Sequence, residues 1–505
     1  MVFSSLIFLF VFLPLVLLCH FACPARWRNI VLLVFSFAFY AWGEPRAFFV
    51  MLAVILVNWC LALAIERCRA MPRLCTGFLL VALCASFGFL FYFKYLDFAS
   101  HCVQYVLRLF GIHSPRFTDI VLPIGISFYV FQSVSYTIDV WRGECSPQRN
   151  IAKLALYISF FPQLIAGPIV KYHEIEAQLT SRHITLEGFA GGLRRFIFGL
   201  AKKTLIANSV ATVADSVFGN FMSATSASLW VGALAYSLQI YFDFSGYSDM
   251  ALGLARMFGF HFEENFNYPY VSRSVAEFWR RWHISLGSWF REYLFYPVFR
   301  EWNGSIGKRL RKSGHKQAAK NVPLVMSLAV VWFVTGLWHG AAFVFIAYGL
   351  YHGFFIILET LTKEKSDKVK KLLHINEEAV WFKVFATLRT FAIVYFSYLL
   401  FRSPGIRSAL NYFAKMFTLS PKGSLEIYSL AYFATGWDAF VMALAAVLCL
   451  PVWPSIKRHL SAAAQSEGSH LALRIAVNVF CLALLLLCAT TLASGTYNPF
   501  IYFRF

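Results

Sequence analysis

Long apolar runs recur along the whole chain and limit what it can fold into. A run of about 20 apolar residues can cross the hydrocarbon core of a bilayer as one helix. The first such run, residues 2–21, contains no Lys, Arg, Asp or Glu, and the third covers residues 47–65. About thirteen stretches are candidates for membrane helices. After the first three, they lie near residues 74–93, 120–138, 154–170, 189–218, 229–244, 322–337, 341–358, 382–401, 434–452 and 471–492.

Two of these runs contain residues that interrupt a helix. Pro123 and Gly125 stand in one, and Pro162 stands in another. A broken helix at membrane depth is tolerated only where protein or a wet cavity surrounds the exposed backbone. We therefore predict an all-α polytopic membrane protein with about 11–13 transmembrane or re-entrant helices. We expect the whole chain, residues 1–505, to form a single membrane domain.

The composition supports a membrane protein. Hydrophobic residues make up 59% of the chain and charged residues 14%, whereas soluble domains contain roughly 45–50% and about 25%. These values exclude a disordered protein and argue against a single soluble domain. The eleven Cys include no CxxC pair, and several lie inside apolar runs, which argues against a zinc or thioredoxin-like site.

The excess of positive charge indicates how the chain is oriented. Lys and Arg number 45 against 25 Asp and Glu, a net charge of +20. Arg26 and Arg28 follow the first run, and Arg67, Arg69 and Arg73 follow the third. Cytoplasmic loops are enriched in Lys and Arg, so an extracytoplasmic N-terminus places both clusters in the cytoplasm. No Lys or Arg precedes Arg26, so we expect a retained first helix, not a cleaved signal peptide.

Residues 263–320 differ from the rest because they are polar, aromatic and basic. We expect a segment at the cytoplasmic surface with short amphipathic helices, in which Glu277 and Arg281 form a favourable helical pair. Seven cations follow within 21 residues, opposed only by Glu301: Arg300, Lys308, Arg309, Arg311, Lys312, Lys316 and Lys320. A solvated loop that obeys topology explains them, and so does a docking surface for anionic lipid or a phosphorylated cofactor.

His339 is the leading candidate for a functional residue. It lies in an apolar stretch, residues 322–358, which as one helix would be about 55 Å long against roughly 30 Å of hydrocarbon. The stretch therefore predicts a hairpin or a broken helix with His339 near the break, flanked by Gly336 and Gly340. A satisfied interfacial histidine is the other interpretation.

His283 is the second candidate and follows Arg280, Arg281 and Trp282. Nearby cations disfavour a protonated imidazole, so we expect a neutral ring at pH 7. A neutral ring can accept a proton, as general-base catalysis requires. A structural histidine in an aromatic belt is the alternative.

Other polar residues in or near the apolar runs have weaker signals. For Asp243 and Asp249 we favour structural pairing over helix capping or lining a cavity, because an unpaired carboxylate is costly there. His352 lies 13 residues after His339, which on one helix is roughly 140° around the axis. A two-histidine metal site is therefore not indicated, and we expect no metal and no nucleic-acid partner. The absence of GxSxG, P-loop and GxGxxG motifs argues against a hydrolase elbow, ATP-driven transport and nicotinamide chemistry.

Four blocks, in this order, resemble the membrane-bound O-acyltransferase (MBOAT) family. They are residues 1–5, 265–270 (NFNYPY), 277–286 (EFWRRWHISL) and 337–341 (LWHGA). Within the family the chain is similar to the bacterial branch that O-acetylates alginate and peptidoglycan. The resemblance extends to the ending at residues 500–505. One departure is 298–300 (VFR), where relatives often carry Leu-Gly-Gly, which bears on the loop that follows and on partner choice.

The resemblance implies a multi-helix fold around a membrane-crossing tunnel, in the bacterial inner membrane. It implies that His339 is catalytic and that His283 is a second important polar residue. It also implies acetyl-CoA as donor, an extracytoplasmic polysaccharide such as alginate as destination, and a separate extracytoplasmic esterase-like acetyltransferase as partner. Our hypothesis is that His339 acts as general base at the junction of a basic cytoplasmic mouth and an aromatic interior.

The remaining candidate residues receive roles under the same hypothesis. Donor-binding roles fall to Arg280, Arg281, Trp282 and Trp338, and structural polar roles to Asp243, Asp249 and Glu277. Peptidoglycan O-acetylation and D-alanyl transfer to teichoic acid remain alternatives within the family. A transporter or flippase is an alternative of another class, but it predicts two related halves, which the sequence does not display. A scaffold that recruits a soluble acetyltransferase is a further alternative.

Overall fold

The computed structural model describes residues 1–112, 120–418, 428–463, 467–495, 498 and 501. Within these residues the chain is helical, and the only β-pairing is two isolated bridges, Phe266 with Trp282 and Ala224 with Tyr428. The all-α class predicted from the apolar runs is confirmed. The ending at residues 500–505, one of the blocks of the resemblance, lies outside the described residues except for Ile501.

The chain divides into two compact units. Unit 1 comprises Met1–Ala201, Gly246–Glu263 and Ala483–Arg504, and unit 2 comprises Lys202–Ser245 and Glu264–Leu482. Two helices contribute residues to both units, α12 (Ser226–Met257) and α24 (Glu467–Ser494). Our expectation of a single membrane domain stays a prediction.

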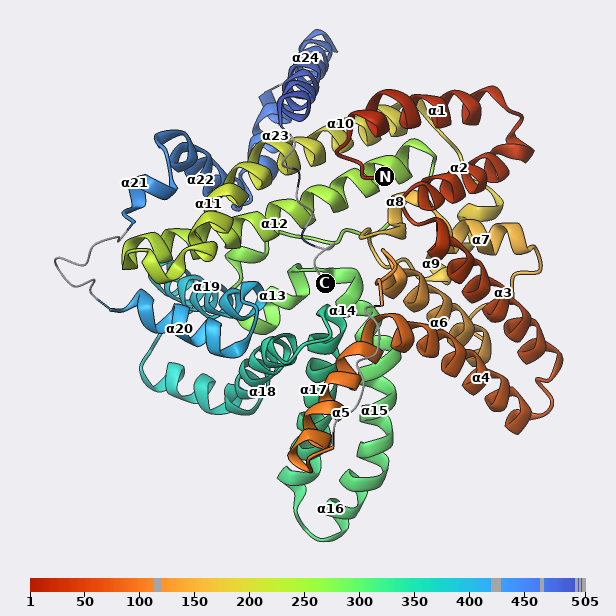
Figure 1. The fold of residues 1–505 in the computed structure, drawn as a ribbon, viewed down its shortest axis with the longest axis vertical. Helices are drawn as coiled ribbons and strands as arrows, with labels where there is room; N and C mark the ends of the chain where they lie inside the picture. Colours follow the sequence, from red (N-terminus) through yellow and green to blue (C-terminus); the bar gives the residue numbers. More distant parts are fainter. Residues whose placement is uncertain (113–119, 419–427, 464–466, 496–497, 499–500, 502–505) are drawn as a thin grey trace. The chain divides into compact units, whose positions relative to one another are not determined.

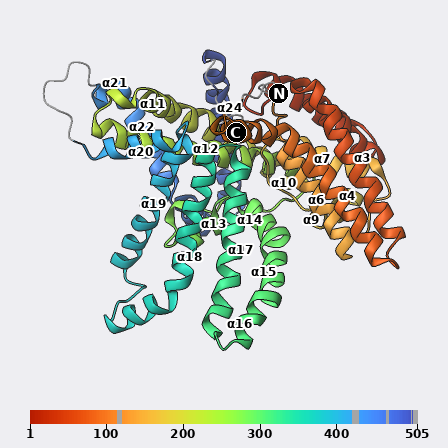
Figure 2. The same cartoon turned by 60° about the horizontal axis from the view of Figure 1, so that its bottom comes forward.

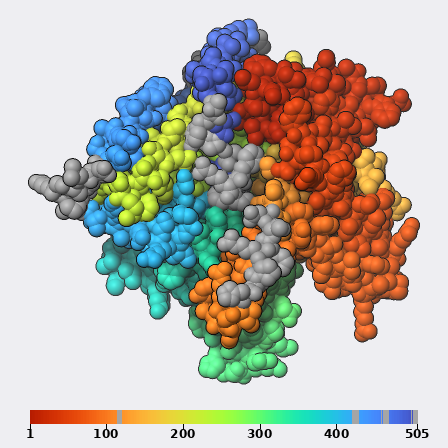
Figure 3. All heavy atoms as spheres, viewed as in Figure 1, coloured from red at the N-terminus to blue at the C-terminus, as the bar shows by residue number. Residues whose placement is uncertain are grey.

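Unit 1 contains the first ten α-helices, coloured red to yellow in Figures 1 and 3. They are α1 (Leu13–Ala22), α2 (Arg28–Gly43), α3 (Pro45–Arg67), α4 (Pro72–Leu90), α5 (Leu96–Leu109), α6 (Ile126–Arg142), α7 (Ile151–Ser159), α8 (Phe161–Leu164), α9 (Tyr172–Thr180) and α10 (Leu186–Ala201). The first apolar helix covers only Phe8–Ala22, shorter than the run at residues 2–21. The reason is that the opening residues turn into the core: Phe3 is buried and stacks on Tyr247 at 4.7 Å.

The interruptions at Pro123–Gly125 and near Pro162 are real breaks, and they lie against each other in unit 1. Gly125 precedes α6 with a φ of 78°, and a Cβ there would lie 2.6 Å from the carbonyl oxygen of Leu164. Only glycine accepts both this backbone conformation and this close approach. The segment around Pro162 is buried among protein atoms. The break near Pro162 is therefore enclosed by protein, as expected for non-helical backbone at membrane depth, whereas at the other break Pro123 is buried and Ile124 and Gly125 are half-buried.

Unit 2 carries the remaining helices. They are α11 (Asn208–Gly219), α13 (Val275–Arg281), α14 (Ile284–Phe290), α15 (Tyr296–Trp302), α16 (Lys308–Lys312), α17 (Lys316–His339), α18 (Phe343–Leu372), α19 (Val380–Arg402), α20 (Ile406–Met416), α21 (Leu430–Phe433), α22 (Gly436–Leu448) and α23 (Val452–Ala463). Figure 2 shows α17 and α18 running side by side with their connected ends together.

A helical hairpin, residues 284–339, dominates one side of unit 2. The π-helical turns η7 (Arg291–Phe295) and η8 (Asn303–Gly307) join α14, α15 and α16 end to end, and α17 returns antiparallel to them (Figure 2). The outgoing arm is about 43 Å long at 1.5 Å per residue. The expected short helices are present as α14, α15 and α16, but they follow one another without a break, and the surface location of the segment stays a prediction. The tip around α16 projects at the lower edge of the space-filling view (Figure 3).

Seven helices of the described residues are both long and apolar enough to cross a membrane. They are Pro45–Arg67, Pro72–Leu109, Leu186–Gly219, Lys316–His339, Phe343–Leu372, Val380–Arg402 and Gly468–Ser494, and two shorter apolar helices are Phe8–Ala22 and Gly436–Leu448. The chain is thus a multi-pass membrane protein. Some other predicted runs became interior helices; α6, for example, buries Gln132, Ser133, Thr137 and Asp139, which makes it less apolar than a lipid-facing span.

Candidate functional site

The apolar stretch at residues 322–358 is broken into two helices, α17 and α18, as predicted. Helix α17 ends at His339 and α18 begins at Phe343, so His339 lies at the break. The two helices approach closely at Gly336, which has no Cβ. A Cβ there would come within 3.0 Å of the carbonyl oxygen of Phe345. Gly349 on α18 meets the backbone of Gly336 in the same way. Glycines that allow two membrane helices to touch are a common means of packing in bilayers.

His339 is buried, with 5% of its surface exposed. Its ring centroid lies 4.8 Å from that of Trp338, 5.1 Å from that of Phe401 and 5.6 Å from that of Tyr348. Aromatic rings thus surround the imidazole on several sides. A polar group held at such a position in a membrane protein needs a reason, and function is the usual one.

His283 is equally buried and immediately precedes α14. Its backbone adopts a left-handed conformation, with a φ of 45°, directly after the bridge between Trp282 and Phe266. Its Nδ1 lies 3.2 Å from Oδ1 of Asn265. Burial lowers the pKa of His283 to about 3, so the ring is neutral at pH 7. We predicted a neutral ring, but from neighbouring cations, whereas the dominant cause is desolvation.

Trp338 connects the two histidines. Its ring centroid lies 5.7 Å from that of His283 and 4.8 Å from that of His339. The two candidates, far apart in sequence, thus come together at the open end of the helical hairpin. Of the predicted donor-binding residues, Trp338 touches both histidines, Trp282 is buried against Phe278 and Tyr270, Arg281 pairs with Glu277, and Arg280 is exposed.

His352 belongs to the same aromatic cluster, and the sequence did not predict this. It is fully buried on α18, and its ring lies 4.8 Å from Tyr348, which also contacts His339. The Ser397 hydroxyl donates to the carbonyl oxygen of Val394, so it accepts from Nε2 of His352 at 3.0 Å. Tyr348, one helical turn before His352, thus connects it to His339. On a single continuous helix the two histidines would have lain on different faces. Asn265 and Tyr348 are further residues that sequence reasoning missed.

The carboxylates with predicted structural roles all form ion pairs. Asp243 contacts Lys203 at 2.7 Å, with both side chains at most 3% exposed, and Asp249 contacts Arg195 at 2.8 Å. Glu277 contacts Arg281 at 2.9 Å. Burying a charge is costly unless it is paired, so these contacts account for how the carboxylates are tolerated. Among the described residues no group of three His, Cys, Asp or Glu is placed to hold a metal ion.

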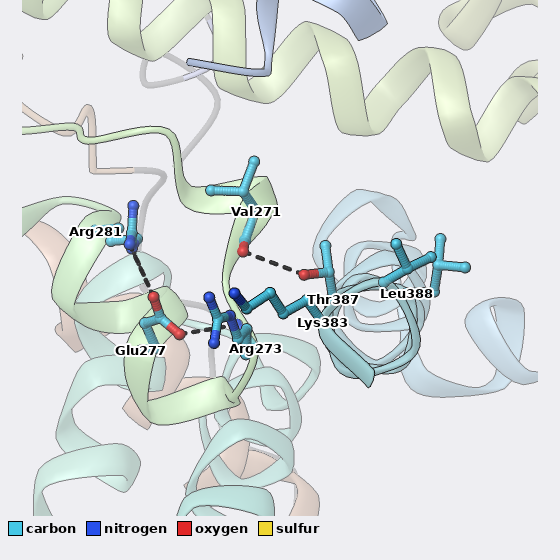
Figure 4. Close-up of a pocket in the computed structure, with 8 residues that line it drawn as sticks. Val271, Arg273, Glu277, Arg281, Lys383, Thr387 and Leu388 are labelled. Carbon is cyan, nitrogen blue, oxygen red and sulfur yellow. Dashed lines mark hydrogen bonds and ion pairs between the residues drawn. The ribbon is translucent and has the colours of Figure 1, made fainter. Parts of the chain in front are cut away.

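A pocket of about 520 Å³, with charged and apolar residues in its lining, lies beside α13 and the start of α19 (Figure 4). Its lining residues are Val271, Arg273, Glu277, Arg281, Lys383, Val384, Thr387 and Leu388. Figure 4 shows Glu277 between Arg281 and Arg273, whose backbone N–H donates to Glu277 at 2.9 Å. Three cations against one carboxylate make this lining suited to an anion.

The exposed carboxylate of Glu378 bridges two of the pocket cations. It lies 2.7 Å from Nζ of Lys383 and 3.7 Å from Nη1 of Arg273. The hydrogen bond from Lys383 lowers the pKa of the Glu378 carboxyl, which therefore stays ionised near neutral pH. Two of the three pocket cations therefore already pair with a carboxylate of the chain itself.

The basic tip and the histidine pair lie at opposite ends of the helical hairpin. Lys320 and His339 are separated by about 29 Å along α17 at 1.5 Å per residue, close to the roughly 30 Å of a hydrocarbon core. Lys320 also contacts Glu364 on α18 through an exposed ion pair at 3.2 Å. His339 is thus remote from the basic segment, and the hypothesis that it acts as general base at the junction of a basic mouth and an aromatic interior stays a prediction.

Comparisons with known proteins place this site in a family. The sequence profile of MBOAT, the membrane-bound O-acyltransferase family, matches residues 144–402, which include both histidines. A probable alginate O-acetylase of Azotobacter vinelandii is 37% identical over 100% of both chains. One from Pseudomonas aeruginosa is 38% identical over 83% of this chain and 75% of its own. A peptidoglycan O-acetyltransferase of Helicobacter pylori is 31% identical over 81% and 79%. The chain therefore belongs to the membrane-bound O-acyltransferase family, and it is a multi-pass membrane O-acyltransferase.

Proposed function

We propose that this enzyme takes acetyl groups from cytoplasmic acetyl-CoA and passes them across the inner membrane for O-acetylation of an extracytoplasmic polysaccharide, alginate or a similar polymer. The observation that carries the proposal is the pair His283 and His339 on one indole, at the end of the hairpin away from its cations. The full-length similarity to a protein named alginate O-acetylase supports this acyl group and this acceptor.

In this proposal His339 is the catalytic base. Its imidazole accepts the proton of an acceptor hydroxyl while the hydroxyl oxygen attacks the thioester carbonyl carbon. The C–S bond then breaks, the acetyl ester forms, and the proton passes to the departing thiolate. A positioned base of this kind contributes about 10²–10⁴-fold to the rate. His283 and Trp338 orient the reacting groups beside it.

The pocket beside α13 is the proposed anchor for the phosphates of the donor. By the positive-inside rule the start of α19 and the basic tip face the cytoplasm, where acetyl-CoA is available. Thr387 lines the pocket, and Tyr398, eleven residues further along α19, contacts Trp282. This separation is about 17 Å along the helix. An extended thioester arm anchored at the pocket thus points along α13 toward the histidines, through the proposed tunnel.

The charges near the start of the chain indicate on which side of the membrane the N-terminus lies. We infer an extracytoplasmic N-terminus, so that Arg26, Arg28 and Arg67 face the cytoplasm. In unit 2, with the basic tip in the cytoplasm, His339 lies near the opposite side of the membrane, where an esterase-like partner or the polymer itself receives the acetyl group. A reporter that is active only outside the cytoplasm, fused before Met1, should be active. A silent fusion that is expressed at normal levels contradicts this orientation.

The activity can be tested with purified protein in nanodiscs. Acetyl-CoA labelled in the acetyl group should lose its label to an oligosaccharide acceptor in a reaction that requires His339. The His339→Ala variant should be at least 10²-fold slower, while His101→Ala, an exposed histidine on α5, serves as control for substitution itself. Near-normal acetylation by a well-expressed His339→Ala variant contradicts the proposed catalytic role.

A further inference from the structure

Asn265 is a buried polar residue placed directly against His283. It lies in the chain between α12 and α13 and is fully buried. Its backbone carbonyl accepts the N–H of Ile284 at 3.0 Å. Its side-chain Oδ1 lies 2.9 Å from Oγ of Ser285, 3.2 Å from the backbone N of Ser285 and 3.2 Å from Nδ1 of His283. The side-chain oxygen of Asn265 thus contacts both His283 and Ser285 at the start of α14.

These contacts determine which atom of Asn265 faces His283. The backbone N–H of Ser285 can only donate a hydrogen bond, so the side-chain atom opposite it must be the amide oxygen and not the NH₂ group. An amide oxygen can only accept. Nδ1 of His283 therefore carries the hydrogen of this contact. In a neutral imidazole with hydrogen on Nδ1, the lone pair is on Nε2.

The ring of His283 is also fixed in orientation by neighbours from two helices. Phe244 on α12 contacts it at 4.7 Å with an interplanar angle of 86°, and Trp338 on α17 contacts it at 5.7 Å and 60°. Rotation of the imidazole would break the Asn265 contact and disturb both aromatic contacts. The geometry therefore holds the ring in one plane and in one tautomer.

We propose that Asn265 is a positioning residue for acyl transfer: it holds His283 in the Nδ1–H tautomer and so presents Nε2 as a hydrogen-bond acceptor to the reacting groups. The proposal rests on the proposed function for its catalytic consequence, but the tautomer itself does not depend on the reaction. An N–H or O–H of the donor or the acceptor is the group that such a nitrogen binds. The other tautomer would carry its hydrogen on Nε2 and present a donor to the reacting groups, and its Nδ1 lone pair would lose the hydrogen bond to Oδ1 of Asn265.

Paired charges lie on the helices around this site, and the nearby Arg280 and Glu264 are exposed. On α12, Asp243 precedes Phe244 and pairs with Lys203. On α13, Arg281 pairs with Glu277, and on α17 the titratable neighbour is His339 beside Trp338. A new carboxylate at position 265 would therefore be the carboxylate in direct contact with His283. It would favour the protonated ring and raise the pKa of His283.

Three variants at two positions test the proposal. Asn265→Leu removes the acceptor at similar volume, and we expect kcat for acetyl transfer to fall by about 10- to 100-fold, as for other residues that orient a functional histidine. Asn265→Asp keeps the acceptor oxygens, so it should recover activity at high pH, with the acidic limb of the pH–kcat profile shifted upward. Asn267→Ala is the matched control. Asn267 is exposed, and its hydrogen bonds with Arg281 use its own backbone N–H and carbonyl, which alanine keeps.

A spectroscopic measurement separates this proposal from the proposed function. In the protein labelled with ¹⁵N-histidine, the signal missing from His283→Gln identifies His283, and its shifts should report hydrogen on Nδ1 and a lone pair on Nε2. Hydrogen on Nε2 overturns the proposal, as does a pH–kcat profile of Asn265→Asp identical to that of the wild type. If no variant and no wild-type protein transfers acetyl, the proposed function fails while the tautomer is still decided by the spectrum.

Discussion

His283 and His339 share the indole of Trp338, at ring centroid distances of 5.7 and 4.8 Å, although both arms of the helical hairpin lie between them in the sequence. The contact depends on α14–α16 running out over residues 284–312 and α17 running back over residues 316–339. Two polar rings are thereby gathered in an aromatic environment that excludes water. Such exclusion strengthens every hydrogen bond and charge interaction at the reacting atoms.

Trp338 should be needed for both the position and the environment of these rings. Trp338→Ala leaves a cavity between the histidines, and we expect it to cost about 3–5 kcal/mol of stability and to reduce acetyl transfer strongly. Trp338→Phe retains a ring of smaller size and should keep a larger share of both. Thermal unfolding in detergent and kcat measure the two effects. Equal activities of the two variants, with both proteins folded, would argue against the shared role of the indole.

The close approach of α17 and α18 should be sensitive to a single methyl group. In Gly336→Ala the new Cβ meets the backbone of α18, so we expect a loss of about 1–3 kcal/mol from overpacking and a displaced His339. Gly77→Ala on α4 is the control, because a Cβ there has no neighbour within 4 Å. That variant should have wild-type stability or slightly more. The measurement is the unfolding temperature of each variant, which should be lower for Gly336→Ala. Equal unfolding temperatures would refute the close packing of α17 against α18 at Gly336.

Charge changes at the pocket should move donor affinity in opposite directions. Lys383→Gln removes a cation and should raise the KM for acetyl-CoA, whereas Glu378→Gln removes a competing carboxylate from Lys383 and Arg273 and should lower it. Both effects should shrink as salt is raised to about 1 M, where the Debye length is about 3 Å. Steady-state kinetics at two ionic strengths provide the test. A change of the same sign in both variants would exclude the pocket as the site of the phosphates.

The contact between His173 on α9 and Asp139 on α6 should make stability depend on pH. The hydrogen bond to Asp139, at 3.1 Å, raises the pKa of His173. Its stabilising contribution is therefore complete below about pH 6.5, the unperturbed value, and is lost as pH rises through the pKa of the folded state. The difference in unfolding temperature between wild type and His173→Gln should be largest near pH 6 and should vanish by pH 9. A difference that grows with pH contradicts this assignment.

Features that depend on the length and polarity of apolar runs could be predicted from the sequence. Features that depend on contacts between distant segments could not. The break at His339 followed from a stretch too long for one helix, and the family followed from four ordered blocks. The continuous arm from residue 284 to residue 312 was missed because Pro297 and Gly304 indicate interruption, whereas they lie beside or within π-helical turns that continue the helix.

The surroundings of His283 were not readable for a related reason. Asn265 is a single polar residue in a connecting segment and has no periodic signal. Its contact with His283 depends on the bridge between Phe266 and Trp282, which no local pattern indicates. The neutral state of the ring was predicted, but its cause was not, because burial depends on packing by Phe244 and Trp338 from elsewhere in the chain.

The helical hairpin also determines where this enzyme can change in length. One residue inserted into either arm would turn everything beyond it by about 100° and shift it by 1.5 Å, so one imidazole would swing away from the other. The turn at residues 313–315 lies beyond both arms, and extra residues there leave the two ends in register. Insertions and deletions within this segment should therefore be tolerated at the tip alone, or in compensating pairs that change both arms by the same length.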